Sequence, residues 1–319
     1  MTNEPGHKLD RPGHSARKGD VSSQSIEAAL SRLLGQATSQ SLNAGLYLVA
    51  TPIGNLADIT VRAVAIIARA DRVFCEDTRV TRRLLDACGV LRTLETYHEH
   101  NASEVRPRIL AALADKQVVA LVSDAGTPLI SDPGYKLVAE AAAAGHLVSA
   151  VPGASALTAA LSVAGLPTDS VTFLGFLPAK SGARAARLEP FATVHTTLVV
   201  YEAPHRLAAT LGGLHHVLGS RDAVVARELT KLHEDVRRGA LDALAQWAEG
   251  ATIKGEVAIV IGPPHGPVVV SDDEIAAYLG TLMAEHRLAE AARLAADHFK
   301  VPRQRAYQLG LKLKGQTHG

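Results

Sequence analysis

Residues 117–134, QVVALVSDAGTPLISDPG, decide which fold this sequence specifies. The run Val118–Val122 is uninterrupted and apolar, which is the composition of a strand buried on both faces of a parallel sheet. A loop with two Ser-Asp pairs, two glycines and two prolines follows, and then a helical pattern that Gly145 ends. Ligands bind beyond the carboxyl ends of the strands in open α/β sheets, so we expect this loop to bind a ligand.

The rest of the chain predicts an α/β protein of two domains with a helical appendage. Strands at 46–50, 72–75 and 147–151, each followed by a loop and a helix, predict a parallel sheet with helices on both faces across residues 45–166. Residues 167–262 predict a second α/β domain with a mixed sheet, whose strands we expect at 171–174, 196–202, 222–228 and 256–261.

The two ends of the chain differ from its middle. We predict that residues 1–44 form a disordered extension, because 1–24 are polar and interrupted by Pro and Gly. Within it, an apolar helix face over residues 26–34 is an alternative with no evident docking site. A stiff segment, GPPHGP at 262–267, precedes the helical appendage at 268–319. Its helix, break and basic helix resemble a helix-turn-helix, and the alternative is an appendage that covers the second domain.

Composition restricts the class of protein. The chain has 319 residues, 47% apolar and only 4% aromatic, so two cores of Ala, Leu and Val are expected. A net charge of +1 neither requires nor excludes a polyanionic partner. Cys75 and Cys88 have no CxxC spacing, which favours reduced thiols. We find no signal peptide and no apolar run of membrane-spanning length, so we expect a cytoplasmic protein without a membrane partner.

Two kinds of site are disfavoured by the motifs. His98 and His100 stand two residues apart with no matching group of ligands downstream, so no metal site is predicted. No GxGxxG motif follows a strand, which argues against a nicotinamide-dependent enzyme.

Five segments together carry a resemblance to a known family: LVATPIGNLADIT (48–60), EDTR (76–79), SDAGTPLISDPG (123–134), VPGASA (151–156) and ARELTKLHED (226–235). In this order and spacing they resemble the tetrapyrrole methylase superfamily. They are most similar to its branch that methylates the ribose 2′-oxygen of a cytidine in bacterial small-subunit ribosomal RNA. The resemblance covers about 46–262. It implies a homodimer of two-domain subunits with S-adenosylmethionine in the cleft between the domains.

The resemblance also implies which residues contact the cofactor. Those that match family positions are Pro52, Ile53, Gly54, Gly126, Thr127, Ile130, Ser155, Ala156, Glu202 and Leu229. Gly126-Thr127-Pro128 stands where the family has Gly-Asp-Pro, so either Asp124 supplies the carboxylate or none is needed. Pro152 and Gly153 precede a helix N-terminus, whose free N–H groups suit the carboxylate of the cofactor.

Catalysis on a ribose hydroxyl needs a group that takes its proton. From the segments that match the family we propose Glu228 and Lys231 in the second domain, and Asp77 and Arg79 in the first. A partly desolvated Lys231 would have a lowered pKa and accept the proton. Arg79 would hold a phosphate, with Asp77 orienting it. The alternative is that the four residues form a structural ion-pair network.

The partner that the resemblance implies is small-subunit ribosomal RNA, within the assembled subunit. Some members of three basic groups would face its phosphates, and the alternative is that they form a solvated surface. The first comprises Arg62, Arg69, Arg72, Arg79, Arg82, Arg83 and Arg92; the second Arg227, Lys231, Arg237 and Arg238; the third Lys180, Arg184 and Arg187 in an expected loop. Two other functions stay open: a tetrapyrrole C-methyltransferase, and a non-catalytic protein that binds the cofactor and nucleic acid.

Overall fold

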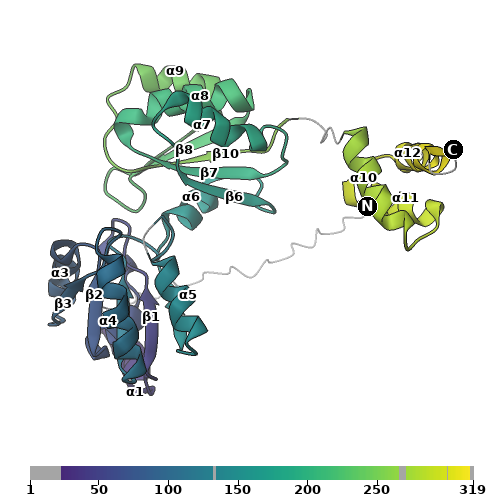
Figure 1. Cartoon of the computed structure of the whole chain (residues 1–319). Helices are drawn as coiled ribbons and strands as arrows, with labels where there is room; N and C mark the ends of the chain where they lie inside the picture. Colours follow the sequence, from purple (N-terminus) through teal and green to yellow (C-terminus); the bar gives the residue numbers. More distant parts are fainter. Residues whose placement is uncertain (1–22, 132–133, 266–270, 300, 317–319) are drawn as a thin grey trace, which may run out of the picture.

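The computed structural model describes residues 23–131, 134–265, 271–299 and 301–316. Figure 1 shows two α/β domains, one above the other, and a group of three helices beside them. This confirms the predicted fold class of two α/β domains with a helical appendage. No helix within these ranges is both long and apolar enough to cross a bilayer.

The first sheet is parallel, as predicted, and its strands lie in the order β3-β2-β4-β1-β5. Its strands are β1 (Gly45–Val49), β2 (Arg72–Cys75), β3 (Leu94–Thr96), β4 (Val118–Val122) and β5 (Val148–Val151). The sequence did not predict β3, because this edge strand has three residues, none of them buried, and so leaves no apolar run. The strand predicted to be buried on both faces, β4, is buried along its whole length and lies in the middle of the sheet.

Helices cover both faces of the first sheet. Val118, Ala120 and Val122 of β4 pack with α2 (Val61–Arg69) and α3 (Thr78–Ala87). Val119 and Leu121 point the other way and pack with α4 (Ala102–Ala114) and α5 (Tyr135–Ala143). The period-2 alternation of a strand therefore divides one apolar run between two cores.

The second sheet is mixed, as predicted, in the order β6-β7-β10-β8-β9. Its strands are β6 (Val171–Phe176), β7 (Thr197–Glu202), β8 (Asp222–Arg227), β9 (Asp235–Ala240) and β10 (Val257–Ile261). Only β6 and β7 are parallel neighbours in it. The sequence did not predict β9, whose DVRRGA run is polar and has no buried residue.

The helices of the second domain divide its sheet into a core face and a face toward the first domain. The core face carries α7 (Ser181–Leu188), α8 (Leu207–Leu218) and α9 (Leu241–Glu249). The opposite face carries α6 (Ala156–Ala164), through Ala160 and Ala164. The predicted boundary at residue 166 placed α6 in the first domain, whereas the structure packs it on the second sheet.

The ends of the described chain are helical. Residues 23–39 form α1 (Ser23–Ser39), so the predicted disordered extension is wrong for this part, and residues 1–22 lie outside the described ranges. Arg69 of α2 holds the end of α1 by donating to the carbonyls of Ala37 and Gln40, at 3.4 and 2.9 Å. The appendage consists of α10 (Asp272–Met283), α11 (Leu288–Phe299) and α12 (Arg303–Gln316), which share a separate alanine-rich core.

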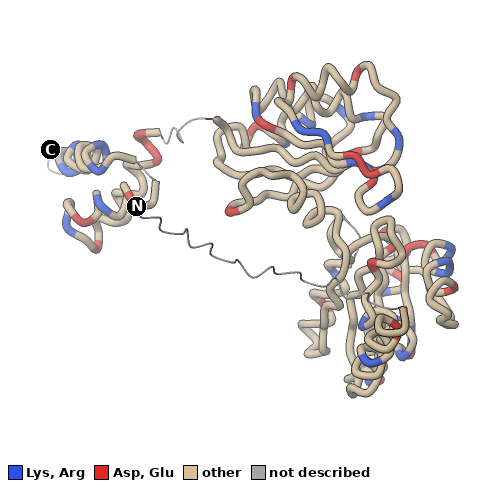
Figure 2. Tube along the Cα trace, turned by 180° about the vertical axis from the view of Figure 1, so that it is seen from behind, with Lys and Arg blue, Asp and Glu red and all other residues tan. Residues whose placement is uncertain are grey.

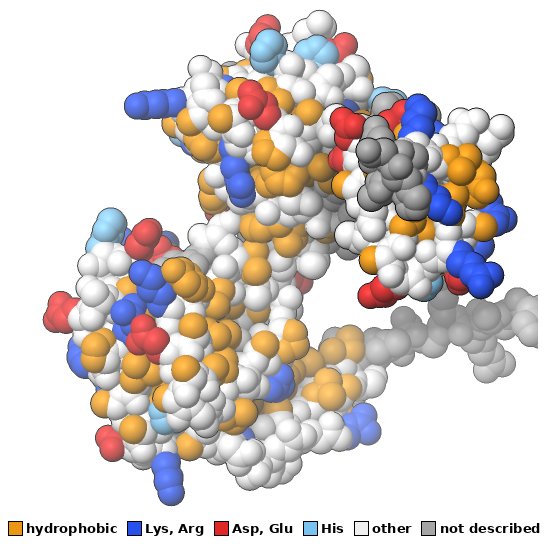
Figure 3. All heavy atoms as spheres, turned by 45° about the vertical axis from the view of Figure 1, so that its right-hand side comes forward, with side chains coloured by type: hydrophobic (Ala, Val, Ile, Leu, Met, Phe, Trp, Pro, Cys, Tyr) orange, Lys and Arg blue, Asp and Glu red, His pale blue; other side chains and the backbone are white. Residues whose placement is uncertain are grey.

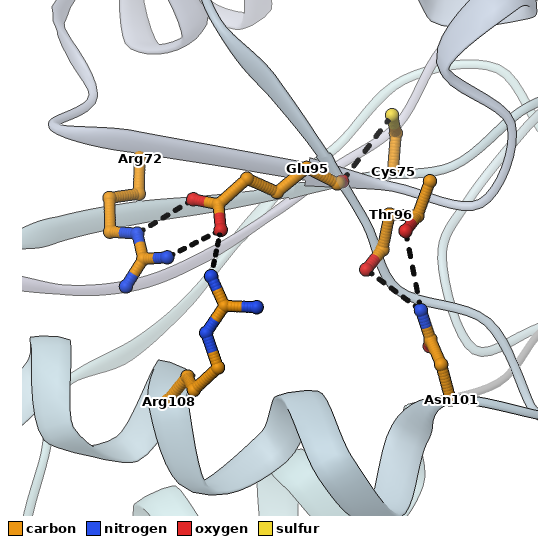
Figure 4. A network of polar contacts seen from close by, with 6 residues as sticks. All are labelled: Arg72, Cys75, Glu95, Thr96, Asn101 and Arg108. Carbon is orange, nitrogen blue, oxygen red and sulfur yellow. Dashed lines mark hydrogen bonds and ion pairs between the residues drawn. The ribbon is translucent and has the colours of Figure 1, made fainter.

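Most of the first predicted basic group serves the fold. Arg72 forms an ion pair with Glu95 across β2 and β3 at 2.5 Å, and Arg108 reaches the same carboxylate at 2.8 Å (Figure 4). Arg62 and Arg92 donate to backbone carbonyls. These guanidinium groups have partners within the chain, which explains their presence without a phosphate, and the phosphate contacts expected from the sequence stay predictions.

Several members of the other two basic groups also have structural contacts. Arg184 lies in α7, not in a loop, and is buried against α8, where its Nη2 donates to the Ala209 carbonyl at 3.0 Å. Arg237 stacks over Trp247 at 4.4 Å, and Arg238 donates to carbonyls at the end of α6. A guanidinium at a helix C-terminus satisfies carbonyls that have no partner within the helix.

Candidate functional site between the two domains

The loops that follow β1 and β4 are joined by backbone hydrogen bonds. Thr51 N donates to the Gly126 carbonyl at 2.9 Å, and Gly126 N donates to the Thr51 carbonyl at 3.1 Å. The Thr51 hydroxyl donates to the Ser123 carbonyl at 3.0 Å. Gly126 has a φ of +81°, a conformation in which a side chain would be strained. The two predicted ligand loops therefore form one rigid unit.

This unit carries Ile53 into the second domain. Ile53 is 8% exposed and packs in the cluster formed by α6 and the second sheet, which includes Val199, Ala226 and Ala258. Beside it lies a cavity of about 420 Å³ with walls from both domains. Figure 3 shows hydrophobic side chains along the hollow between the two lobes. The volume falls in the range of small-molecule sites.

Many of the predicted cofactor residues line this cavity. They are Ile53, Gly126, Thr127, Ile130, Ser155, Ala156, Glu202 and Leu229. The others are placed nearby but do not line it: Pro52, Gly54, Asp124, Pro152 and Gly153. Gly153 is explained by packing, since a Cβ atom there would lie 3.0 Å from that of Ala50. It also lines a second cavity, of about 380 Å³, beside the start of α6.

Glu202 lines the cavity but is held by the fold. It is 2% exposed, accepts hydrogen bonds from Ala203 N at 2.8 Å and the Thr210 hydroxyl at 2.6 Å, and forms an ion pair with Arg206 at 3.2 Å. These partners satisfy the oxygens of a carboxylate that would be costly to bury without hydrogen bonds. Its structural role is to fix the end of β7 beside the cavity.

Gly54 makes room for a residue of the other domain. A Cβ atom at position 54 would collide with the aliphatic stem of Lys231. The Lys231 ammonium forms ion pairs with Glu228 at 2.8 Å and with Glu256 at 3.0 Å. Glycine is therefore needed at position 54 because Lys231 of the other domain packs closely against its backbone. Glu256, which pairs with Lys231, lines the cavity.

The charges in this network oppose the predicted role of Lys231. Burial lowers the pKa of Lys231, but hydrogen bonds to Glu228 and Glu256 outweigh burial and the net effect raises that pKa. The hydrogen bond from Lys231 lowers the pKa of Glu228. A lowered pKa was the reason to expect Lys231 to accept a proton, and this reason is wrong. Lys231 is a stable cation at neutral pH.

Asp77 and Arg79 form a separate cluster at the start of α3. Their side chains are joined by an ion pair of 2.5 Å, which holds the pKa of Asp77 at about 2. Asp77 N donates to Asp124 at 3.0 Å. Burial and the nearby Asp77 charge raise the pKa of Asp124, although that hydrogen bond opposes them. No hydrogen bond or ion pair connects this cluster with Glu228 and Lys231 among the described residues.

Left-handed backbone conformations gather around the cavity. Leu129 and Ser131 in the loop after β4, and Glu228 and Thr230 in the loop after β8, have φ values between +52° and +71°. Such conformations cost about 1–3 kcal/mol each and concentrate at functional sites. Their location supports the assignment of this junction as the functional site.

The sequence missed the contribution of the second sheet to the cavity. The lining residues of the second domain that it did not predict are Phe176, Tyr201, Ala203, Pro204, Ala226, Glu256, Val257 and Ala258, while Ala125 and Ser131 lie in the loop after β4 that was expected to bind a ligand. Ala226 and Ala258 are register partners on β8 and β10, and their small side chains leave the space open. In the sequence they are ordinary strand residues, so only the pairing of the strands reveals them. Within the ranges that the structure describes, no group of three or more His, Cys, Asp or Glu side chains is placed to hold a metal ion.

A family model described as Tetrapyrrole (Corrin/Porphyrin) Methylases matches residues 45–245. The chain belongs to the tetrapyrrole methylase family. A second model, the RsmI C-terminal HTH domain, matches residues 269–314 and supports the helix-turn-helix interpretation of α10–α12. Figure 1 agrees, because these helices stand apart from the second domain and do not cover it.

Curated relatives of this tetrapyrrole methylase are named ribosomal RNA small subunit methyltransferase I. The protein of that name from Mesorhizobium japonicum is 49% identical over 278 residues, covering 86% of this chain and 94% of the relative. The protein from Synechocystis sp. is 44% identical over 273 residues, covering 84% and 98%.

Solved structures confirm the fold at greater distance. Cobalt precorrin-4 methyltransferase aligns with a TM-score of 0.51 at 18% identity, covering 68% of this chain and 94% of that one. Diphthine synthase aligns with a TM-score of 0.53 at 17% identity, covering 68% and 89%. At these identities the likeness concerns the fold alone.

The lowered pKa of Glu228 predicts a pH-dependent contribution to stability. Above its ordinary pKa of 4.5, ionised Glu228 pairs with Lys231, and Glu228→Gln should destabilise the protein by about 1 kcal/mol. As the pH falls through the lowered pKa of Glu228 in the folded state, the wild type loses this contribution. The free energies of unfolding of the wild type and of Glu228→Gln then become equal.

Urea unfolding at pH 3.5, 5 and 7 measures that difference. Glu249→Gln in α9 is the control, because Glu249 has no ion pair in the described part of the chain. A stability difference that is the same at pH 3.5 and pH 7 would contradict the assignment.

Proposed function

We propose that this protein transfers a methyl group from S-adenosylmethionine to the ribose 2′-oxygen of a cytidine in small-subunit ribosomal RNA. The observation that carries the proposal is the match with relatives named ribosomal RNA small subunit methyltransferase I, along 94% of the length of one of them. The helix-turn-helix match in the same chain favours a nucleic acid over a tetrapyrrole as substrate.

The cavity between the domains fits the cofactor chemically. Its walls are largely apolar, from Ile53, Leu229 and Val257 among others, and suit the adenine and the methylene groups. Ser155 and Ala156 line it at the start of α6, where Ser155 makes no side-chain cap. The free N–H groups of that first turn suit a carboxylate. When bound, S-adenosylmethionine supplies an electrophilic methyl group on a sulfonium.

Filling the cavity should block cofactor binding. Ala258→Phe places a ring where Ala226 and Ala258 leave space, so we expect S-adenosylmethionine affinity to fall by more than about tenfold in titration calorimetry. Ala142→Phe, the same change on the exposed side of α5, should bind as the wild type does. Unchanged affinity in a folded Ala258→Phe variant would place the cofactor elsewhere.

The reaction itself is tested with a labelled methyl group. Wild-type protein is incubated with small ribosomal subunits that lack the modification, and separately with uroporphyrinogen. Digestion of the RNA should give labelled 2′-O-methylcytidine. Label in uroporphyrinogen alone would favour the tetrapyrrole alternative, and label in neither would favour a non-catalytic binding protein.

We assign the removal of the hydroxyl proton to Glu256. Of the three residues in the Lys231 network, only Glu256 lines the main cavity. Its side chain is 75% exposed, so its carboxylate is hydrated and accessible to a substrate. The Lys231 ammonium, 3.0 Å away, orients that carboxylate, while Glu228 holds Lys231 in place. Glu228 and Lys231 are then positioning residues, and the predicted direct roles of Asp77 and Arg79 stay predictions.

Replacing the proposed proton acceptor should reduce turnover without affecting binding. Glu256→Gln keeps the size of the side chain but removes its basicity, so we expect kcat to fall by about 10²–10⁴-fold. The affinity for S-adenosylmethionine and the melting temperature should hold. Asp124→Asn is the matched comparison, because Asp124 also lies near the cavity; a large loss there and none at Glu256 would transfer the role to Asp124.

The exposed face of α12 is our candidate for RNA binding. Figure 2 shows basic residues along this helix. The residues that point away from its core include Gln304, Tyr307, Gln308, Leu311 and Lys312. Polar, aromatic and cationic side chains on one helix face suit phosphates and unstacked bases.

A charge reversal on this face should weaken RNA binding in a salt-dependent way. Lys312→Glu should lower the affinity for small subunits and reduce the slope of log K against log salt by about one. Lys116→Glu, at the amino end of β4 and remote from the cavity, is the control. Equal slopes in filter-binding assays for both variants would exclude a phosphate contact at Lys312.

Two further expectations belong to this proposal. A protein that modifies ribosomal subunits acts in the cytoplasm, and the assembled subunit is the expected substrate. The homodimer implied by the family stays a prediction, which analytical ultracentrifugation can test.

A further inference from the structure

A β-bulge in β6 turns an aromatic side chain toward the cavity. The pairing of β6 with β7 runs from Phe173 opposite Val199 to Gly175 opposite Val200, so Leu174 is an extra residue in the strand. Gly175 has a φ of +64°, as expected for a bulge that needs glycine. Bulges of this kind redirect side chains next to active sites.

The bulge changes which side chains share a face of the sheet. In a regular strand, residues 173 and 176 would point to opposite faces. Here Phe173 and Phe176 both contact Tyr201 in edge-to-face geometry. Their ring centroids lie 4.9 Å and 5.7 Å from that of Tyr201, respectively. Leu174 and Leu177 pack together in the core on the other face. The extra residue is therefore what brings Phe176 to the cavity.

Phe176 is not needed to bury the core. Phe176 is 60% exposed although it lines the cavity, whereas Ala226, Val257 and Ala258 at the inner wall are at most 5% exposed. The ring thus lies at the mouth of the cavity, in contact with Tyr201 on one side and with most of its surface open to solvent. An exposed phenyl ring fixed in this way has a free surface on which a planar group can stack.

The contact between the domains places this ring where a large substrate must enter. A Cβ atom at Gly175 would lie 3.3 Å from the Ser131 hydroxyl of the first domain. Ile130, the neighbour of Ser131, lines the same cavity. Phe176 and the loop after β4 therefore meet where the two domains line one cavity, whose buried inner wall suits a small molecule.

We propose that Phe176 is a positioning residue on which the base of the target nucleotide stacks. This inference rests on the proposed function, and it names how that site holds its RNA. A nucleotide whose ribose is modified deep in a protein must leave the stack of its neighbours, and an aromatic ring replaces the stacking that it loses. Every base has a π-face, so this contact positions the nucleotide, and hydrogen bonds elsewhere select it.

The test compares four variants: Phe176→Ala, Phe176→Leu, Phe176→Trp and, as a control on the same strand, Val171→Ala, whose side chain is 37% exposed. Methyl transfer to small ribosomal subunits gives kcat and KM, calorimetry gives S-adenosylmethionine affinity, and melting temperature reports the fold. Loss of the stacking of one base should lower RNA affinity by about tenfold or more.

We expect Phe176→Ala and Phe176→Leu to raise KM for small subunits by about that factor while cofactor affinity and melting temperature hold. Phe176→Trp should restore KM, and Val171→Ala should behave as the wild type. Weakened cofactor binding in Phe176→Ala would overturn the proposal by assigning the ring to adenine. A wild-type KM in Phe176→Ala, or full rescue by Phe176→Leu, would also overturn it. If the wild type itself does not methylate small subunits, the proposed function fails, which is a distinct result.

Discussion

The pair of backbone hydrogen bonds between Thr51 and Gly126 is the constraint on which the site depends. It joins the loops after two neighbouring strands of the first sheet into one unit. That unit places Ile53 against the second sheet and Gly54 under Lys231. Without it the first domain would present two independent loops, and the walls of the cavity would not be held at a fixed separation.

The charged residues at the domain junction mainly hold the two domains in place, and they do not lower the pKa of Lys231. Lys231 between two glutamates is a stable cation, and its stem packs against the backbone of the opposite domain. The less exposed pair, Lys231 with Glu228, holds the lysine in place beside Gly54 of the other domain, and the exposed Glu256 adds a second carboxylate to it. Many of the arginines also have structural partners. They donate to carbonyls at helix ends or form ion pairs between strands, so few guanidinium groups are left to contact a nucleic acid. The RNA binding that we propose would therefore rest on a few surfaces, among which α12 is separate from the two α/β domains.

The cavity is made by small residues and one irregularity in the second sheet. Paired alanines on β8 and β10 leave the space, and the bulge in β6 brings a phenyl ring to its opening. These features lie on the face that α6 covers only in part. A domain that buries one face of its sheet with three helices can thus use the other face for a ligand and a neighbouring domain.

The sequence by itself determined the two α/β domains, the helical appendage and the loops that form the first-domain wall of the cavity. Apolar runs such as Val118–Val122, and loops fixed by glycine and proline, are local signals that depend little on the rest of the chain. Tertiary structure alone decided the short polar edge strands, the packing of α6 on the second sheet and the cavity residues of β7, β8 and β10. It also reversed the expected pKa shift of Lys231, because the two carboxylates that raise that pKa include Glu256, twenty-five residues away. Contacts between residues distant in the sequence depend on strand pairing and domain packing, which no local pattern encodes.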